Sequence, residues 1–178
     1  DDYWLSGMGK ILERCSQSDA DIIYGRVQFV DEKGQFLTES SGSRFYQLFP
    51  LLAARGIYIF TQQAALIRRS LYQKLGGFDE SFALLADNDF WIRAIRSGAK
   101  CEFVNEVCAA YRMHGGQLSA NVTSGLAERA RMLEKHGLSK GSFATLCATA
   151  FYRSCNTPRY IRRVLSGKSY IRRTAKRQ

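Results

Sequence analysis

The sequence predicts an α/β domain in which a mixed β-sheet is flanked by helices. Three observations lead to this prediction. Segments with the apolar spacing of helices alternate irregularly with short runs rich in Ile, Val and other strand-forming residues. Hydrophobic residues make up 46% of the chain and charged residues 24%, as in ordinary globular proteins. A length of 178 residues is enough for one domain with a substantial core.

The N-terminal part is expected to contain a helix followed by a β-hairpin. Apolar residues recur at three- and four-residue steps and predict an amphipathic helix: Trp4, Leu5, Met8, Ile11, Leu12 and Cys15. Residues 19–30 carry the β-branched residues of a strand. The turn at residues 31–34 can end in a left-handed Gly34, and residues 35–38 would form the returning strand.

The rest of the chain is predicted to alternate helices with short strands. Helical spacing marks residues 45–55 and 84–97, which stop at Gly56 and Gly98. Ser70 is expected to cap a further helix that ends at Gly76 and Gly77. Short apolar runs predict strands at residues 57–60, 64–67, 101–104 and 107–111. From residue 119 onward the pattern is helical, with a break near residues 156–158.

The positive charge of the chain is concentrated at its C-terminal end. The net charge is +10, and nine of the 26 basic residues lie in residues 151–178, which contain no acidic residue. The first 150 residues therefore hold 17 basic and 16 acidic residues. We call residues 151–178 the basic C-terminal segment. Its arginines are interleaved with Tyr and Ile, a pattern typical of a helix on an anionic membrane surface, of a solvated extension or of a nucleic-acid-binding segment.

Cysteine usage and the termini bear on the cellular compartment. The five cysteines are odd in number and show no CxxC spacing, so we expect buried free thiols in a reducing cytoplasm and neither a disulfide framework nor a zinc site. No apolar run is long enough to span a bilayer, and the first residues are not those of a signal peptide. The chain lacks a starting Met, and we expect it to begin inside a longer protein.

Two acidic features are candidates for chemistry. Asp1 and Asp2 are adjacent carboxylates before a predicted helix, which could hold Mg²⁺ or Mn²⁺ or remain solvated. Asp87 and Asp89 open another helix, where the helix dipole favours negative charge. The bulky residues that follow, beginning with Phe90 and Trp91, could instead desolvate a carboxylate and make it a general base.

The two histidines have different settings. His114 follows a predicted strand and precedes a pair of glycines, a position that can present its imidazole to a ligand or leave it without function. His136 is expected on the charged surface of a helix, where it would be inert.

Five segments, taken in order, resemble family 2 glycosyltransferases of the GT-A fold. Asp1–Leu5 is similar to the end of the family's metal-binding motif and its helix. The segments that follow are similar to later motifs: residues 19–25 with 30–34, residues 62–70 with 75–81, residues 86–93, and residues 111–114. The resemblance covers residues 1–121, the acceptor-side part of a GT-A domain. Residues 122–178 would then form a helical, basic extension.

The resemblance implies inverting transfer of a sugar from a nucleotide-diphosphate sugar to an acceptor hydroxyl. It implies that Asp87 is the general base and that Asp89 orients the acceptor site. The resemblance also implies that Asp1, Asp2 and His114 bind a Mn²⁺ or Mg²⁺ ion. Seven residues would line the substrate-binding pocket: Gln63, Gly76, Gly77, Phe78, Asp79, Trp91 and Arg112.

Two features depart from the family pattern. Ala86 stands where many members carry Glu, and the family's N-terminal nucleotide-binding half is not among these residues. The 178 residues alone are therefore expected to show little or no transferase activity.

The expected partners are a nucleotide-sugar donor, a saccharide or lipid-linked acceptor and, through the basic C-terminal segment, an anionic membrane surface. Nucleic acid is disfavoured because the rest of the chain carries no basic stripe. We expect the protein in the cytoplasm, either free or bound to the inner face of the cell membrane, in cell-surface polysaccharide or lipid-linked sugar synthesis. The alternative is a non-catalytic binding module whose basic segment associates with membranes.

Overall fold

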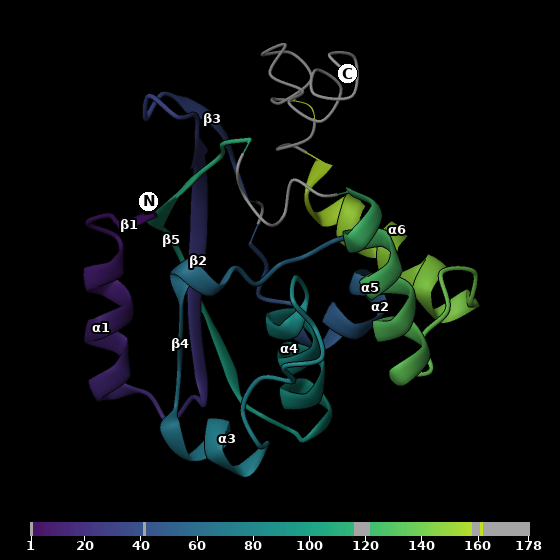
Figure 1. Ribbon diagram of the computed structural model, residues 1–178. Helices are drawn as coiled ribbons and strands as arrows, with labels where there is room; N and C mark the ends of the chain where they lie inside the picture. Colours follow the sequence, from purple (N-terminus) through teal and green to yellow (C-terminus); the bar gives the residue numbers. More distant parts are fainter. Residues whose placement is uncertain (1, 41, 116–121, 158–160, 162–178) are drawn as a thin grey trace.

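A five-stranded mixed β-sheet organises the chain, for which the computed structural model describes residues 2–40, 42–115, 122–157 and 161 (Figure 1). The long strands β2 (Ile22–Val30) and β5 (Cys101–Arg112) lie parallel at its centre. The short strand β1 (Tyr3–Trp4) pairs antiparallel with β5. On the other side of β2, the strands β3 (Phe36–Glu39) and β4 (Ala65–Ile67) pair antiparallel with its two halves.

Alternate residues of β2 enter two hydrophobic cores on opposite faces of the sheet. Ile23 and Val27 pack with Met8 and Ile11 of helix α1 (Met8–Gln17), which covers one face. Ile22 and Tyr24 belong to the larger core on the other face. Because successive side chains of a strand point to opposite faces, a strand covered on both sides reads as a continuous apolar run, as Ile22–Tyr24 at the start of β2 do.

The larger core is covered by helices from the middle and the end of the chain (Figure 1). Those that contribute buried residues to it are α2 (Phe49–Ala54), α3 (Arg69–Lys74), α4 (Ala86–Arg96), α5 (Val122–Lys135) and α6 (Phe143–Cys155). Two 3₁₀ turns, Tyr46–Leu48 and Gln62–Ala64, precede α2 and β4. The predicted α/β architecture with a mixed sheet and flanking helices is confirmed at this level.

Four local predictions are corrected. Trp4 lies in β1, outside the helix predicted from it, because its backbone pairs with β5. Residues 57–60 form no strand; Ile59 and Phe60 are apolar because they fill the core. The two strands predicted between residues 101 and 111 are one strand, β5, with an irregular register against β2. Ser70 lies inside α3, whose N-cap is Arg68.

The cysteines are free but mostly not buried. Cys15, Cys147 and Cys155 are exposed, Cys101 is half-buried and Cys108 is buried. The prediction of buried thiols is therefore wrong for three of them, which lie on the outward faces of α1 and α6, away from the two cores. Within the described ranges, no helix combines the length and the apolar character needed to cross a membrane.

Candidate functional site

Asp2, Gln63 and Arg112, three predicted site residues, meet at one end of the sheet. The Asp2 carboxylate accepts a hydrogen bond from the Arg112 backbone N–H through Oδ1 (2.9 Å) and one from Gln63 Nε2 through Oδ2 (2.9 Å). The pairing of β1 with β5 explains the first contact. Since Tyr3 lies opposite Ala110 in an antiparallel register, the residue before Tyr3 reaches the residues after Ala110.

This cluster lies where β2 and β5 both end. Val30 and Arg112 are register partners in the parallel pair, and the Met113 backbone N–H donates to the Val30 carbonyl (2.8 Å). The Arg112 guanidinium donates to the Glu32 carbonyl (2.7 Å), which fixes the hairpin turn against the end of β5. His114 follows, half-buried. In open α/β sheets, ligands bind beyond the carboxyl ends of the parallel strands, so this end is suited to a ligand.

The residues at this end fit a metal ion only if a substrate supplies further ligands. Asp1 lies outside the described residues. Within residues 2–40, 42–115, 122–157 and 161, no group of three or more His, Cys, Asp or Glu residues could hold a metal ion. Asp2 keeps lone pairs beyond its two hydrogen bonds. A Mg²⁺ ion is commonly bound by one or two carboxylates together with substrate phosphates and waters. The Asp2 carboxylate fits this kind of site.

Asp87 lies at the start of α4 and is half-buried. Burial raises the pKa of its carboxyl group, against the opposing effect of hydrogen bonds from the neighbouring residue. Its Oδ1 accepts from the backbone N–H of Asn88 (2.7 Å) and from Asn88 Nδ2 (2.9 Å). A carboxylate that is partly desolvated but still reachable has the character of a general base.

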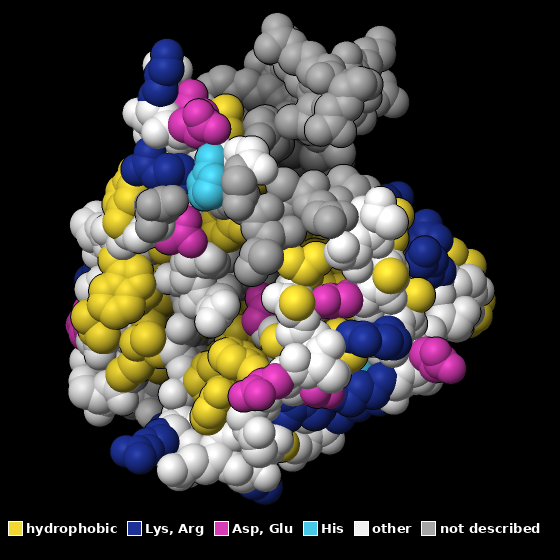
Figure 2. All heavy atoms as spheres, in the orientation of Figure 1, with side chains coloured by type: hydrophobic (Ala, Val, Ile, Leu, Met, Phe, Trp, Pro, Cys, Tyr) yellow, Lys and Arg dark blue, Asp and Glu magenta, His cyan; other side chains and the backbone are white. Residues whose placement is uncertain are grey.

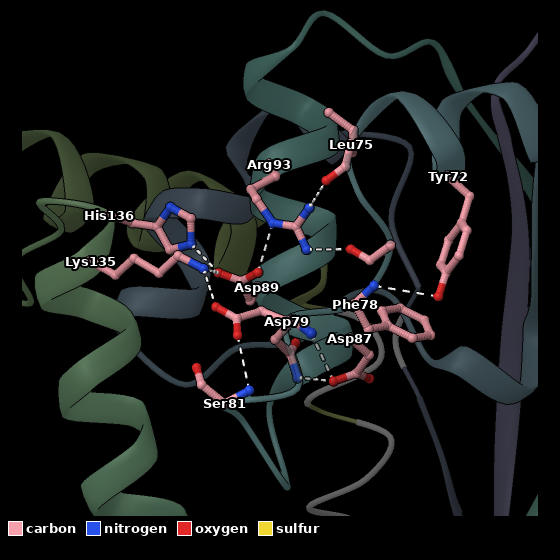
Figure 3. A network of polar contacts seen from close by, with 12 residues as sticks. Tyr72, Leu75, Phe78, Asp79, Ser81, Asp87, Asp89, Arg93, Lys135 and His136 are labelled. Atoms are coloured by element: carbon pink, nitrogen blue, oxygen red, sulfur yellow. Dashed lines mark hydrogen bonds and ion pairs between the residues drawn. The ribbon is translucent and has the colours of Figure 1, made fainter.

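Asp89, two residues later, is completely buried and serves as the centre of an ion-pair network (Figure 3). Its Oδ2 accepts from Arg93 Nε (2.7 Å), and its Oδ1 contacts Lys135 Nζ (2.7 Å) and His136 Nε2 (2.8 Å). Burial acts to raise the pKa of Asp89, but the hydrogen bonds from Lys135, Arg93 and His136 outweigh it and hold the pKa below its usual value. The side chain is an ionised link between α4 and α5.

Arg93 extends this network to the glycine loop, residues 75–79. Besides Asp89, its guanidinium binds the carbonyls of Leu75 and Gly77, each at 2.7 Å. Gly76 and Gly77 have φ angles of 74° and 73°, a conformation that L-residues with side chains rarely adopt. The two predicted glycines are therefore required by the turn, and Arg93 fixes that turn against α4.

The remaining residues of this loop are also held in place. The Phe78 ring packs edge-on against Tyr72 and Phe90. Asp79 accepts from Lys135 Nζ (2.7 Å) and from the Ser81 backbone N–H (2.9 Å). The hydrogen bond from Lys135 is the largest cause of a lowered Asp79 pKa. Lys135 thus bridges Asp79 and Asp89 (Figure 3).

Trp91, predicted to bind substrate, is placed in the core. Its side chain is fully buried and stacks on Phe60, with ring centroids 5.2 Å apart, while Phe90 meets it edge-on. Among the described residues, neither the indole Nε1 nor the buried amide oxygen of Asn88 has a hydrogen-bond partner. Trp91 presents no surface to a ligand in this structure, and its contribution is to support the start of α4.

Sequence reasoning missed the residues that α5 contributes. Glu128 accepts hydrogen bonds from three consecutive backbone N–H groups, those of Ala83, Leu84 and Leu85, at 2.8–3.1 Å, and so fixes the segment that leads into Asp87. The prediction that His136 lies on a charged surface is wrong, because His136 is buried against Asp89. The four-residue spacing of Asp89 and Arg93 was a readable signal for one ion pair.

The predicted site residues thus fall into two groups. One contains Asp2, Gln63 and Arg112 at the carboxyl end of the central strands, and the other surrounds the start of α4 and the glycine loop. Comparison with known proteins adds no family assignment: no protein-family model matches the chain, and no curated protein matches it.

Proposed function

We propose that this chain is the acceptor-side part of an inverting, metal-dependent glycosyltransferase of family 2 with a GT-A-like fold. It would move a sugar from a nucleotide-diphosphate sugar to an acceptor hydroxyl in the synthesis of cell-surface polysaccharide or of a lipid-linked sugar. The proposal rests on one observation above the others. Two carboxylates two residues apart have opposite environments, one raised in pKa and partly open, the other lowered in pKa and enclosed by cations.

In such a pair, the carboxylate with the raised pKa can act as a base, and the one with the lowered pKa remains a fixed negative charge. Asp87 would accept the proton of the acceptor hydroxyl as the hydroxyl oxygen attacks the anomeric carbon. The bond from that carbon to the diphosphate oxygen breaks, and the diphosphate leaves with the electron pair. One displacement of this kind inverts the anomeric configuration. Asp89 would act indirectly, by holding Arg93 and hence the glycine loop beside the acceptor.

The Asp2 cluster would serve the donor. Asp2, together with Asp1 and His114, would hold Mn²⁺ or Mg²⁺, which when bound neutralises charge on the leaving diphosphate. Gln63 and the Arg112 backbone N–H orient the Asp2 carboxylate through the two hydrogen bonds described above. On the resemblance, the pocket for the nucleotide base belongs to a preceding half, so transfer is proposed for a protein that contains both halves.

The decisive experiment compares Asp87→Asn with Asp89→Asn in the full-length protein. Release of nucleoside diphosphate from a panel of nucleotide sugars would be measured with and without acceptors. Asp87→Asn should lower kcat by about 10²- to 10⁴-fold, the usual contribution of general-base catalysis, with the urea midpoint of unfolding unchanged. Asp89→Asn should lower activity and also the urea midpoint, because Arg93, Lys135 and His136 lose their buried partner.

Glu80→Gln is the matched control, since Glu80 is an exposed carboxylate beside the same loop. It should leave both activity and stability near their original values. Transfer that survives Asp87→Asn at full rate would refute the assignment of the base. The non-catalytic binding module would then be the better interpretation. In its favour, both Asp2 oxygens already have protein partners.

A further inference from the structure

Helix α6 presents apolar side chains on its outward face as well as on its inward face. Its inward residues Ala148 and Tyr152 are buried, Tyr152 in the larger core. On the outside, Phe143 is 82% exposed, and Leu146 and Phe151 are each 46% exposed. Leu146 and Phe151 follow Phe143 by three and eight residues, which places all three side chains along the solvent side of the helix. Neighbouring apolar side chains on the outer face of a helix are typical of a surface that binds a second apolar environment.

Basic side chains surround this outward face. Arg153 lies on α6 itself and is exposed, and Lys140 lies in the loop before the helix and is also exposed. Arg44, exposed, lies over the ring of Phe45, which packs edge-on against Phe151. Figure 2 shows Lys and Arg side chains, with a few Asp and Glu side chains among them, bordering apolar side chains on the side of the molecule where α5 and α6 lie. The described surface around α6 therefore combines apolar and cationic groups.

The sequence after α6 continues the same charge pattern. No acidic residue follows Glu134, so α6 and everything after it carry only positive charge. Residues 162–178, which lie outside the described residues, add seven Lys and Arg residues. The charge is thus uniform over a long segment that begins at the apolar face and extends beyond it.

We propose that the outward face of α6, with Arg44, Lys140 and Arg153 beside it, docks on the surface of an anionic lipid bilayer. Phe143, Leu146 and Phe151 would enter the boundary between headgroups and acyl chains, and the Lys and Arg side chains would contact lipid phosphates. A second copy of the chain is a poorer occupant, because two acid-free cationic faces repel each other. Nucleic acid would use the charge but not the apolar residues. The inference does not depend on the proposed transferase activity.

The test measures binding of the full chain to phosphatidylcholine vesicles with and without phosphatidylglycerol, by co-sedimentation. The chain should sediment with the anionic vesicles, and its affinity for them should fall as the salt concentration rises. With pure phosphatidylcholine vesicles it should remain in the supernatant. The double variant Phe143→Ser and Leu146→Ser should bind about tenfold or more weakly, since two exposed side chains lose their place in the bilayer boundary. Circular dichroism would verify that the variant keeps its fold, because both side chains are outside the core.

Leu12→Ser provides the matched control. Leu12 is 51% exposed on α1, which covers the opposite face of the sheet from α6 (Figure 1). This substitution should leave vesicle binding unchanged. Equal binding by the double variant and the original chain would overturn the proposal and leave a purely electrostatic contact. A dimer in analytical ultracentrifugation that dissociates in the double variant, without vesicle binding, would assign the face to a second copy instead. RNA binding in place of vesicle binding would likewise overturn it.

Discussion

Asp87 and Asp89 show how far two similar residues can differ once a chain is folded. Both open α4, and the favourable interaction with the helix dipole applies to both. Two residues further along the same turn of the helix, Asp89 contacts Lys135 and His136. Asp87 accepts hydrogen bonds from its neighbour Asn88 and is partly desolvated by its surroundings (Figure 3). The pKa of Asp87 is raised by burial, whereas that of Asp89 is lowered by Arg93 and by Lys135 and His136, which come from a distant part of the sequence.

His136 makes the stability of the protein sensitive to mild acid. Burial is the largest cause of its lowered pKa; the positive charges of Arg96 and Lys135 add to this, and Asp89 opposes it. The unfolded chain therefore takes up a proton near the ordinary histidine pKa of 6.5, while the folded chain does so only at lower pH. As pH falls through this window the unfolded state binds more protons, so the free energy of unfolding should decrease.

Urea unfolding from about pH 8 to about pH 5, the range in which histidine titrates, would measure this loss. In the variant His136→Gln, which retains a hydrogen-bond donor for Asp89, the urea midpoint should change much less over the same range. A pH dependence that is the same with and without His136 would place the titrating group elsewhere.

Helices and hairpins, which depend on apolar periodicity and turn residues, could be predicted from the sequence. Features that depend on the pairing of distant strands could not. The strand at β2, the hairpin to β3 and the helices α2 and α4 were predicted close to their observed ranges. Trp4 was misassigned because its backbone pairs with a strand more than a hundred residues away. Asp2, Gln63 and Arg112 were each chosen as site residues, but only the sheet order brings them together.

Helix α1 offers a test of how tightly an element is docked on the sheet. Gly7, its N-cap, has no room for a side chain: an added Cβ would lie 2.3 Å from the backbone oxygen of Val107 in β5. Gly7→Ala should therefore push α1 from the sheet and lower the free energy of unfolding by about 1–3 kcal/mol. Urea unfolding followed by circular dichroism would measure it.

Gly9, two residues further along α1, is the matched control. An added Cβ there meets nothing within 4 Å, and the residue is exposed. Gly9→Ala should raise the free energy of unfolding by up to about 1 kcal/mol, because alanine has the higher helix propensity. If both substitutions had the same effect, the contact with β5 would not be what fixes the start of α1.

For the whole molecule, the helices after residue 121 pack into the same core as the sheet. The resemblance to glycosyltransferases ends at residue 121, which predicts a boundary there. In the structure, Met132 and Leu133 of α5 and Tyr152 of α6 lie in one core with Ile22 and Trp91. Arg129 also donates a hydrogen bond to the Ala54 carbonyl at the end of α2 (2.7 Å). The two helices are therefore part of the packing that encloses α2 and α4.

A chain that ends at residue 121 should consequently fail to fold cooperatively. Burial of a large apolar side chain contributes about 1.5–3 kcal/mol, so Met132, Leu133 and Tyr152 together contribute an amount comparable to the net stability of a typical domain. The truncation would also remove Glu128, Lys135 and His136, and with them the contacts that hold the start of α4 and Asp89. A chain that ends at residue 161 keeps all of these and should unfold in a single transition. Thermal unfolding followed by circular dichroism would distinguish the two, and a cooperative transition in the shorter chain would mean that the sheet and α4 are stable without α5 and α6.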